Sequence, residues 1–165
     1  MLIAVLSDTH GRQAAVETAL RYVRSRGAQL VLHCGDIDDA ATVRLFAGIT
    51  SHFVLGNCDT KRDELRRAVA AIAGTCHEPF GDLELGGQKI AFLHGHDHRL
   101  HKDVENSDYF DYLFYGHSHR AEEHRTGRTH VVNPGALHRA NPKTFVLLDL
   151  ASAALEQVHL DRLNG

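Results

Sequence analysis

The chain has 165 residues, of which 43% are hydrophobic and 24% charged, a composition typical of a soluble globular protein large enough to bury a core. Its formal net charge of -3 provides no overall positive surface for nucleic acid or for a membrane. The sequence has no signal-peptide pattern and no long apolar run, and its three cysteines lack disulfide or C-x-x-C spacing. We therefore expect reduced thiols and a cytoplasmic location.

The first half of the chain alternates strands and helices three times. Short apolar runs predict the strands, and apolar residues at helical spacing predict a helix after each one. Such alternation predicts parallel strands with right-handed crossovers. Asp38 or Asp39 is the expected N-cap of the second helix, and residues 60–63 resemble a capping box before the third. The strands are predicted at 2–6, from 30 to a stop at Gly35, and at 52–55, and the helices end at Gly27, Gly48 and Gly74.

The second half favours antiparallel pairing. Gly86-Gly87 and Thr126-Gly127 each predict a hairpin turn between two alternating segments. The polar residues 97–108 predict a helix or a loop, and Asn133-Pro134-Gly135 predicts a turn. Further strands are predicted at 83–85, 88–93, 112–115, 121–125, 128–132, 144–150 and 154–160. The whole pattern predicts a single α/β domain in which helices flank a sandwich of two mixed β-sheets.

Polar side chains that can bind metals follow five of the predicted strands. In sheets with parallel strands, functional groups collect at the carboxyl ends of the strands. Histidine is the commonest metal ligand, and this chain has 14 of them. The glycines beside these residues allow the sharp turns that bring side chains to one point. The residues are Asp8 and His10 after the first strand, Asp36 after the second, Asn57 after the third, and His94, His96, His117 and His119 after two later strands.

These segments resemble the five sequence blocks of the calcineurin-like metallophosphoesterases, and are most similar to the small YfcE-type phosphodiesterases. The blocks are Asp8-x-His10, Gly35-Asp36, Gly56-Asn57-x-Asp59, His94-Gly95-His96 and Gly116-His117-x-His119. Any one block occurs often by chance, but five in order, each at a predicted strand end, make a specific match. The resemblance covers residues 8–119 and implies one metallophosphoesterase domain over residues 1–165, with an αββα sandwich fold.

The resemblance also implies a dinuclear metal centre. One ion would take Asp8, His10, Asp36 and His119, and the other Asp36, Asn57, His94 and His117, so Asp36 bridges the two ions together with a water or hydroxide. Mixed nitrogen and oxygen ligands suit Mn, Fe, Ni, Co or Zn rather than Ca or Mg, and we expect Mn. Two carboxylates against two divalent ions leave a positive site that attracts a phosphodiester. The implied reaction is hydrolysis of a small phosphate ester by in-line attack of the bridging hydroxide.

One position departs from the family pattern. Cys58 stands where many members have a histidine that protonates the leaving group. The Cys58 thiol either acts as this acid or is a small side chain that packs in the loop. His96 is the better candidate for supplying the proton or contacting the substrate. Asp59 then has no histidine to orient, and we expect it to form loop hydrogen bonds or a helix cap. Arg12 and Arg120 either hold a phosphate oxygen or lie in solvent.

Other readings of the site stay open. The same ligands would serve a phosphomonoesterase or a nuclease, and the retromer subunit with this fold is a non-catalytic scaffold. The complete ligand set favours an enzyme. We do not expect membranes as partners, and nucleic acid is not favoured. The resemblance to similar proteins implies a homo-oligomer, either a dimer or a tetramer. Asn133 is expected to brace the site, and His33 to be a hydrogen-bonded core residue.

Overall fold

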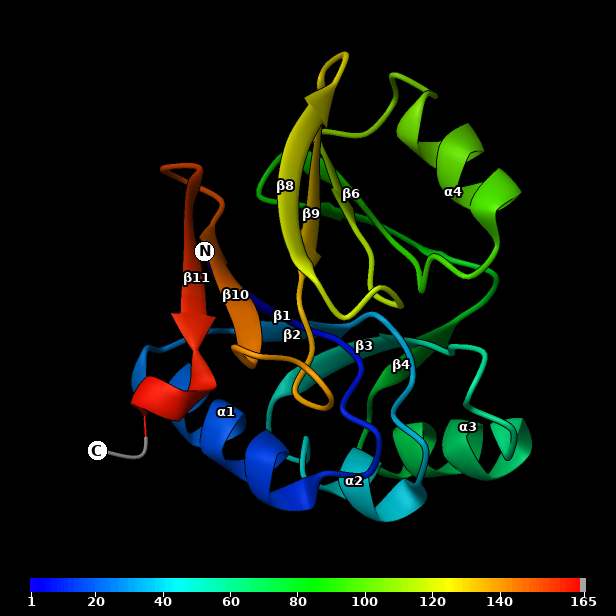
Figure 1. The fold of residues 1–165 in the computed structure, drawn as a ribbon, viewed down its shortest axis with the longest axis vertical. Helices are drawn as coiled ribbons and strands as arrows, with labels where there is room; N and C mark the ends of the chain where they lie inside the picture. The colour runs from blue at the N-terminus through cyan, green and yellow to red at the C-terminus, as the bar shows by residue number, and fades with distance from the viewer. Residues whose placement is uncertain (164–165) are drawn as a thin grey trace.

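The computed structural model describes residues 1–163, which form two stacked β-sheets with helices on both outer faces (Figure 1). The first sheet has six strands in the order β11 (Ala154–His159), β10 (Thr144–Asp149), β1 (Leu2–Leu6), β2 (Leu30–His33), β3 (Thr50–Val54) and β4 (Thr75–His77). The second has five, in the order β5 (Gly81–Leu85), β6 (Gln88–Phe92), β7 (Tyr112–Phe114), β9 (Thr129–Pro134) and β8 (Ala121–Thr126). Both sheets are mixed, as the sequence predicts.

The helices complete a four-layer arrangement. In Figure 1, three of them lie below the six-stranded sheet, and the fourth lies beside the five-stranded sheet. They are α1 (Gln13–Ser25), α2 (Ala40–Arg44) and α3 (Arg62–Ala71) on the first sheet, and α4 (His98–Glu105) on the second; a 3-10 helix, η1 (Leu160–Arg162), follows β11. None of the helices within residues 1–163 has the length and hydropathy needed to span a bilayer.

Three apolar clusters hold the layers together. The first fills the space between the six-stranded sheet and α1 to α3, and includes Val16 and Leu20 at their predicted helical spacing. The second lies between the two sheets, where the inward-facing residues of β1, such as Val5, meet those of β6, such as Phe92. The third packs α4 on the five-stranded sheet. The αββα prediction is therefore confirmed, since each sheet buries both of its faces.

Most local predictions are confirmed, and the exceptions have simple causes. Strands β1, β2 and β3 are parallel, and both predicted hairpins form. The short edge strand β4 was not predicted, because its three partly exposed residues carry no alternating pattern. The predicted turn at 133–135 is wrong in its first two residues, because Asn133 and Pro134 pair with β8 and the chain turns only at Gly135.

The helix starts also differ from one another. Asp39 caps α2, accepting a hydrogen bond from the amide of Thr42 at 2.7 Å, as predicted. The predicted capping box before α3 is wrong, because Lys61 occupies the N-cap position and no side chain caps that helix. The polar segment at 97–108 contains helix α4, which Asp97 caps through the amides of Arg99 and Leu100.

Candidate metal centre

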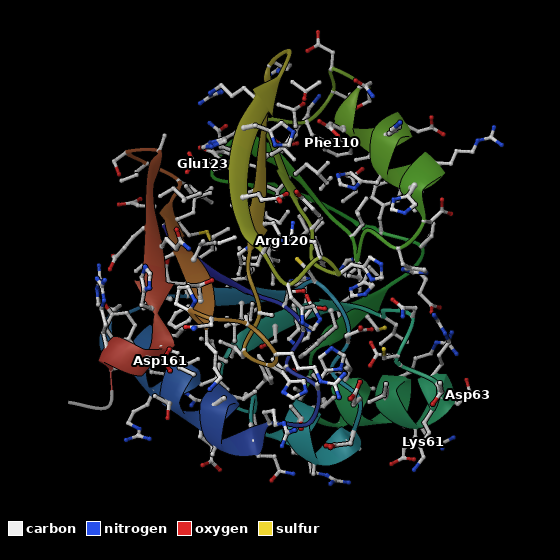
Figure 2. All side chains as sticks on the ribbon, in the orientation of Figure 1. Lys61, Asp63, Phe110, Arg120, Glu123 and Asp161 are labelled. Atoms are coloured by element: carbon white, nitrogen blue, oxygen red, sulfur yellow. The ribbon has the colours of Figure 1, made fainter. Side chains whose placement is uncertain are left out.

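The loops that follow β1, β2, β3, β6 and β7 meet at one end of the sandwich. The amide of Asp8 donates to the carbonyl of Gly35 at 3.0 Å, which joins the first two loops. The amide of His117 donates to Asp8 Oδ2 at 3.0 Å, which joins the two sheets. Arg120, labelled in Figure 2, follows the last of these loops and is exposed. The structure thus brings together the side chains of Asp8, His10, Asp36, Asn57, His94, His117 and His119.

One half of this cluster is formed by Asp8, His10, Asp36 and His119. His119 Nε2 lies 3.2 Å from Asp8 Oδ1 and 3.3 Å from His10 Nε2. His10 Nε2 in turn lies 3.6 Å from Asp36 Oδ2. The atoms of Asp8, His10 and His119 are close enough to share one ion, and they combine the nitrogen and oxygen donors that suit a transition metal.

The other half contains His94, Asn57 and His117. His94 Nε2 lies 3.1 Å from Asn57 Oδ1 and 3.4 Å from Asp36 Oδ2. The ring of His117 lies 5.1 Å from that of His94, centroid to centroid. Asp36 Oδ2 therefore lies close to both His10 Nε2 and His94 Nε2.

Hydrogen bonds to residues outside the cluster hold one atom of Asp8 and one atom of His94. Asp8 is fully buried, and its Oδ2 accepts from Ser7 Oγ at 2.6 Å. Its Oδ1 is buried without a hydrogen-bond partner within residues 1–163. His94 Nδ1 donates to the carbonyl of Cys34 at 2.8 Å, which leaves the lone pair of Nε2 for a metal. Buried polar atoms normally have partners, so the unpaired Asp8 oxygen fits a bound cation.

The backbone of the cluster is strained in the manner of functional sites. Five of its seven residues adopt positive φ angles: Asp8 (51°), His10 (43°), Asp36 (56°), His117 (69°) and His119 (58°). Each such residue costs about 1–3 kcal/mol, and persists only where surrounding contacts compensate. This conformation turns each side chain sharply off its strand toward the centre.

Two glycines allow the loops to approach closely. A Cβ atom on Gly56 would lie 2.1 Å from Asp36 Oδ1, and one on Gly116 would lie 1.9 Å from Ser7 Oγ. Both distances are shorter than any real contact, so larger residues would displace the loops that carry Asp36 and His117. The two glycines therefore allow the loops to pack closely, as expected from their positions beside the candidate ligands.

Comparison with known proteins identifies the family. Residues 1–153 match the family model described as the calcineurin-like phosphoesterase superfamily domain. The chain belongs to this family. It is 25% identical over 138 residues to phosphodiesterase MJ0936 of Methanocaldococcus jannaschii, covering 82% of this chain and 83% of the relative. It is 26% identical over 167 residues to phosphodiesterase YfcE of Escherichia coli, covering 90% and 88%.

Solved structures agree with this assignment. An archaeal phosphodiesterase superposes with a TM-score of 0.89 at 23% identity, covering 96% of this chain and 99% of its own. Vps29 of Entamoeba histolytica, solved with Zn²⁺, superposes with a TM-score of 0.67 at 19% identity, covering 97% and 99%. These likenesses show the shared fold, and the family with its named relatives shows that the protein is a metal-dependent phosphoesterase.

The two carboxylates of the phosphoesterase site differ in acidity. Burial raises the pKa of Asp8 above its ordinary value, more than the hydrogen bond from Ser7 lowers it. Burial also acts on Asp36, but the hydrogen bond and charge of His94 together with the amide of Cys58 outweigh it and lower the pKa of Asp36. The protein itself therefore favours the charged form of Asp36 more than that of Asp8.

Asp59 organises the loop that carries Asp36. Its Oδ1 accepts from the amides of Ile37 and Asp38 at 2.9 and 2.8 Å, and its Oδ2 from those of Asp36 and Gly56 at 2.9 and 2.7 Å. The expected loop hydrogen bonds are confirmed, and no imidazole is involved in them. Asp59 therefore connects the loop after β2 with the loop after β3.

Cys58 and His96 flank the site as two candidate proton donors. The sulfur of Cys58 faces the centre beside His10 and Asp36, and burial together with a hydrogen bond to Asp36 raises its pKa to about 11. The exposed ring of His96 lies 5.4 Å from that of His94. Burial and the charge of His94 lower the pKa of His96.

Several contributing residues were missed at the sequence level. Asp38 Oδ2 lies 3.2 Å from His10 Nδ1 and can orient that ring, although the sequence suggests it only as a helix cap. The ring of His138, to which the sequence assigned no role at the site, lies 5.3 Å from that of His10 and accepts a hydrogen bond from Arg12 Nε at 3.1 Å. The only local signal was the position of Asp38 two residues after Asp36.

The remaining predicted residues lie where expected. His33 is fully buried, with its Nε2 3.1 Å from Thr9 Oγ1. Asn133 donates to the carbonyl of Gly116 at 3.0 Å and to Ser118 Oγ at 3.1 Å, and so braces the loop that carries His117 and His119.

Proposed function

We propose that this phosphoesterase is a phosphodiesterase with a dinuclear metal centre. The observation that carries the proposal is the position of Asp36 Oδ2, which lies within 3.6 Å of His10 Nε2 and 3.4 Å of His94 Nε2 and so belongs to both halves of the cluster. The proposed ligands are Asp8, His10, Asp36 and His119 for one ion, and Asp36, Asn57, His94 and His117 for the other.

The donor set favours two first-row transition ions. We propose Mn²⁺ first, with Fe, Ni, Co and Zn as alternatives. When bound, such a pair supplies Lewis acidity to the phosphoryl oxygens and activates water for in-line attack on phosphorus. The protein itself holds the metal ligands in position. Asp59 holds the Asp36 loop, Cys34 and Asp38 orient two of the imidazoles, and Asn133 braces the last loop.

The charge of the loaded site attracts an anionic phosphodiester. Asp8 and Asp36 offset only half of the charge of two divalent ions, so the loaded site stays positive. A small phosphodiester carries one negative charge and leaves two ester groups to be accommodated, one toward Cys58 and His96 and the other toward Arg12 and His138. A phosphomonoesterase or nuclease would use the same centre with differently shaped surroundings.

The direct test is hydrolysis of bis(p-nitrophenyl) phosphate by protein stripped of metal and then reloaded. We expect turnover to rise by about a hundredfold or more when Mn²⁺ is added, because the bound ions would activate the attacking water and offset charge on the phosphoryl oxygens. Hydrolysis of p-nitrophenyl phosphate, measured in parallel, separates diesterase from monoesterase activity. Absence of turnover with every first-row metal would favour the scaffold function instead.

Proton donation to the leaving group can be tested with substrates of different leaving-group acidity. We expect His96→Ala to reduce kcat about a hundredfold for a diester with an alkyl leaving group, and much less for a p-nitrophenyl diester that departs without a proton. Cys58→Ala is expected to change both rates less, because a thiol with a pKa of about 11 is a weak proton donor at neutral pH.

The control for this comparison is His98→Ala, which removes an exposed histidine two residues further along the chain. It should leave the ratio of the two rates unchanged. Equal losses on both substrates in His96→Ala would show that the residue binds substrate or supports the fold and does not act as the acid.

A further inference from the structure

A cavity of about 710 Å³ lies beside the candidate metal centre. It is bounded by the first turns of α1, the loop between β9 and β10, and η1, whose Asp161 is labelled in Figure 2. Figure 1 shows these three segments, far apart in the sequence, on the same side of the six-stranded sheet. The volume is within the range of about 300–1,000 Å³ that is typical of small-molecule sites.

The cavity lies next to the cluster on its His10 side. Its wall includes Gly11, which directly follows His10, and His138, whose ring lies 5.3 Å from the ring of His10. His96 lies at the other half of the cluster, near His94. A phosphodiester at the centre would therefore direct one ester group toward His96 and the other into this cavity.

The cavity wall is positively charged. It contains two cationic side chains, Arg12 and Lys143, and one acid, Asp161. Neither cation forms an ion pair with any residue among 1–163. Arg12 is oriented by its hydrogen bond to His138, which uses only one of its five donors. The remaining donors and the Lys143 ammonium are available to an anion.

The remaining wall residues are uncharged and suit an uncharged part of a ligand. Ala14, Ala15 and Leu137 provide small apolar surface, and Thr18 adds one hydroxyl. Such a wall, with a few cationic groups at fixed places, is typical of sites that bind a sugar or nucleoside-sized group carrying a phosphate.

We propose that this cavity binds the non-leaving ester group of the substrate, and that this group carries a second phosphate held by Arg12 and Lys143. The inference rests on the proposed function, because it adds a recognition site to the diester that the metal centre would cleave. It assigns the substrate class as phosphodiesters in which one ester group bears its own phosphate.

Two chromogenic substrates test this directly. Thymidine 5′-(p-nitrophenyl phosphate) and its 3′-phosphorylated derivative share the scissile bond and differ only in the remote phosphate. In both, water forms the new bond to phosphorus while the bond to p-nitrophenolate breaks, leaving thymidine 5′-phosphate or thymidine 3′,5′-bisphosphate. We expect wild-type kcat/KM to be about tenfold higher for the phosphorylated substrate, since a hydrogen-bonded charge pair contributes about that much.

Substitution of Lys143 provides the decisive variant. Lys143→Gln keeps a polar side chain of similar size but removes its charge, and we expect the preference for the 3′-phosphorylated substrate to fall about fivefold or more. The matched control is Lys102→Gln, an exposed lysine on α4, which should retain the wild-type preference. A second variant, Ala14→Trp, should lower kcat/KM for both nucleoside substrates by filling the cavity, whereas Ala70→Trp on α3 should not.

The outcomes separate this inference from the proposed function. Hydrolysis of bis(p-nitrophenyl) phosphate without any preference between the two thymidine substrates would overturn the inference and leave the diesterase proposal intact. A preference that survives Lys143→Gln unchanged would equally overturn it. Failure to hydrolyse any diester with any metal would remove the proposed function, and the inference with it.

Discussion

Replacement of Asp36 by Asn is expected to lower kcat/KM for bis(p-nitrophenyl) phosphate by about a thousandfold or more at saturating Mn²⁺. Asp36 Oδ2 faces both His10 and His94, so the neutral amide would weaken both halves of the proposed centre at once. Asp36 Oδ1 accepts from the amide of Cys58 at 2.9 Å, and the Asn carbonyl can keep this bond. The substitution therefore removes the charge while retaining the loop.

A matched control separates the bridging role from a general loss of negative charge. Asp38→Asn neutralises a neighbouring carboxylate that lies 3.2 Å from His10 Nδ1 but belongs to neither proposed ligand set. Its expected loss is about 10- to 100-fold, the usual effect of residues that orient a ligand. Metal content after dialysis should fall in Asp36→Asn and change little in Asp38→Asn. An Asp36→Asn enzyme that kept two ions and activity within about tenfold of wild type would contradict the assignment of a bridge.

The sequence was most informative about where strands end. The alternation of apolar runs and helical patterns fixes three parallel strands, and parallel strands necessarily place their carboxyl ends at one edge. The order of these elements alone is therefore enough to bring Asp8, Asp36 and Asn57 together. The later histidines needed the ordered blocks of the family, because a short strand followed by histidine and glycine is common in unrelated proteins.

Interactions between distant segments could not be predicted in this way. His138 lies near His10 only because the loop between β9 and β10 crosses the start of α1, and the course of that loop follows from packing rather than from local pattern. Ser7, which hydrogen-bonds Asp8, has no signal beyond its position before an acid. Strand β4 was not predicted for a related reason. Its three residues join the sheet by pairing with β3, and not through a strong strand preference of their own.

Asp59 illustrates how a family residue can be retained with a structural role. Its carboxylate is 1% exposed and accepts hydrogen bonds from four backbone amides, belonging to Asp36, Ile37, Asp38 and Gly56. Asp36 and Asp38 both adopt positive φ angles, so the loop needs external contacts to hold this conformation. Four amides that converge on one carboxylate provide them.

Removal of this carboxylate should therefore destabilise the whole domain. We expect Asp59→Ala to lower the free energy of unfolding by about 3–5 kcal/mol, because it leaves four amides without their acceptor in a buried loop. Asp59→Asn should be nearly as damaging, since its NH₂ group would face two of those N–H donors. Urea denaturation at neutral pH without added metal measures the effect independently of catalysis. Asp63→Ala, at an exposed acid in α3 labelled in Figure 2, is the matched control and should leave stability nearly unchanged. A loss below about 1 kcal/mol in Asp59→Ala would mean that the strained loop is held by the two sheets alone.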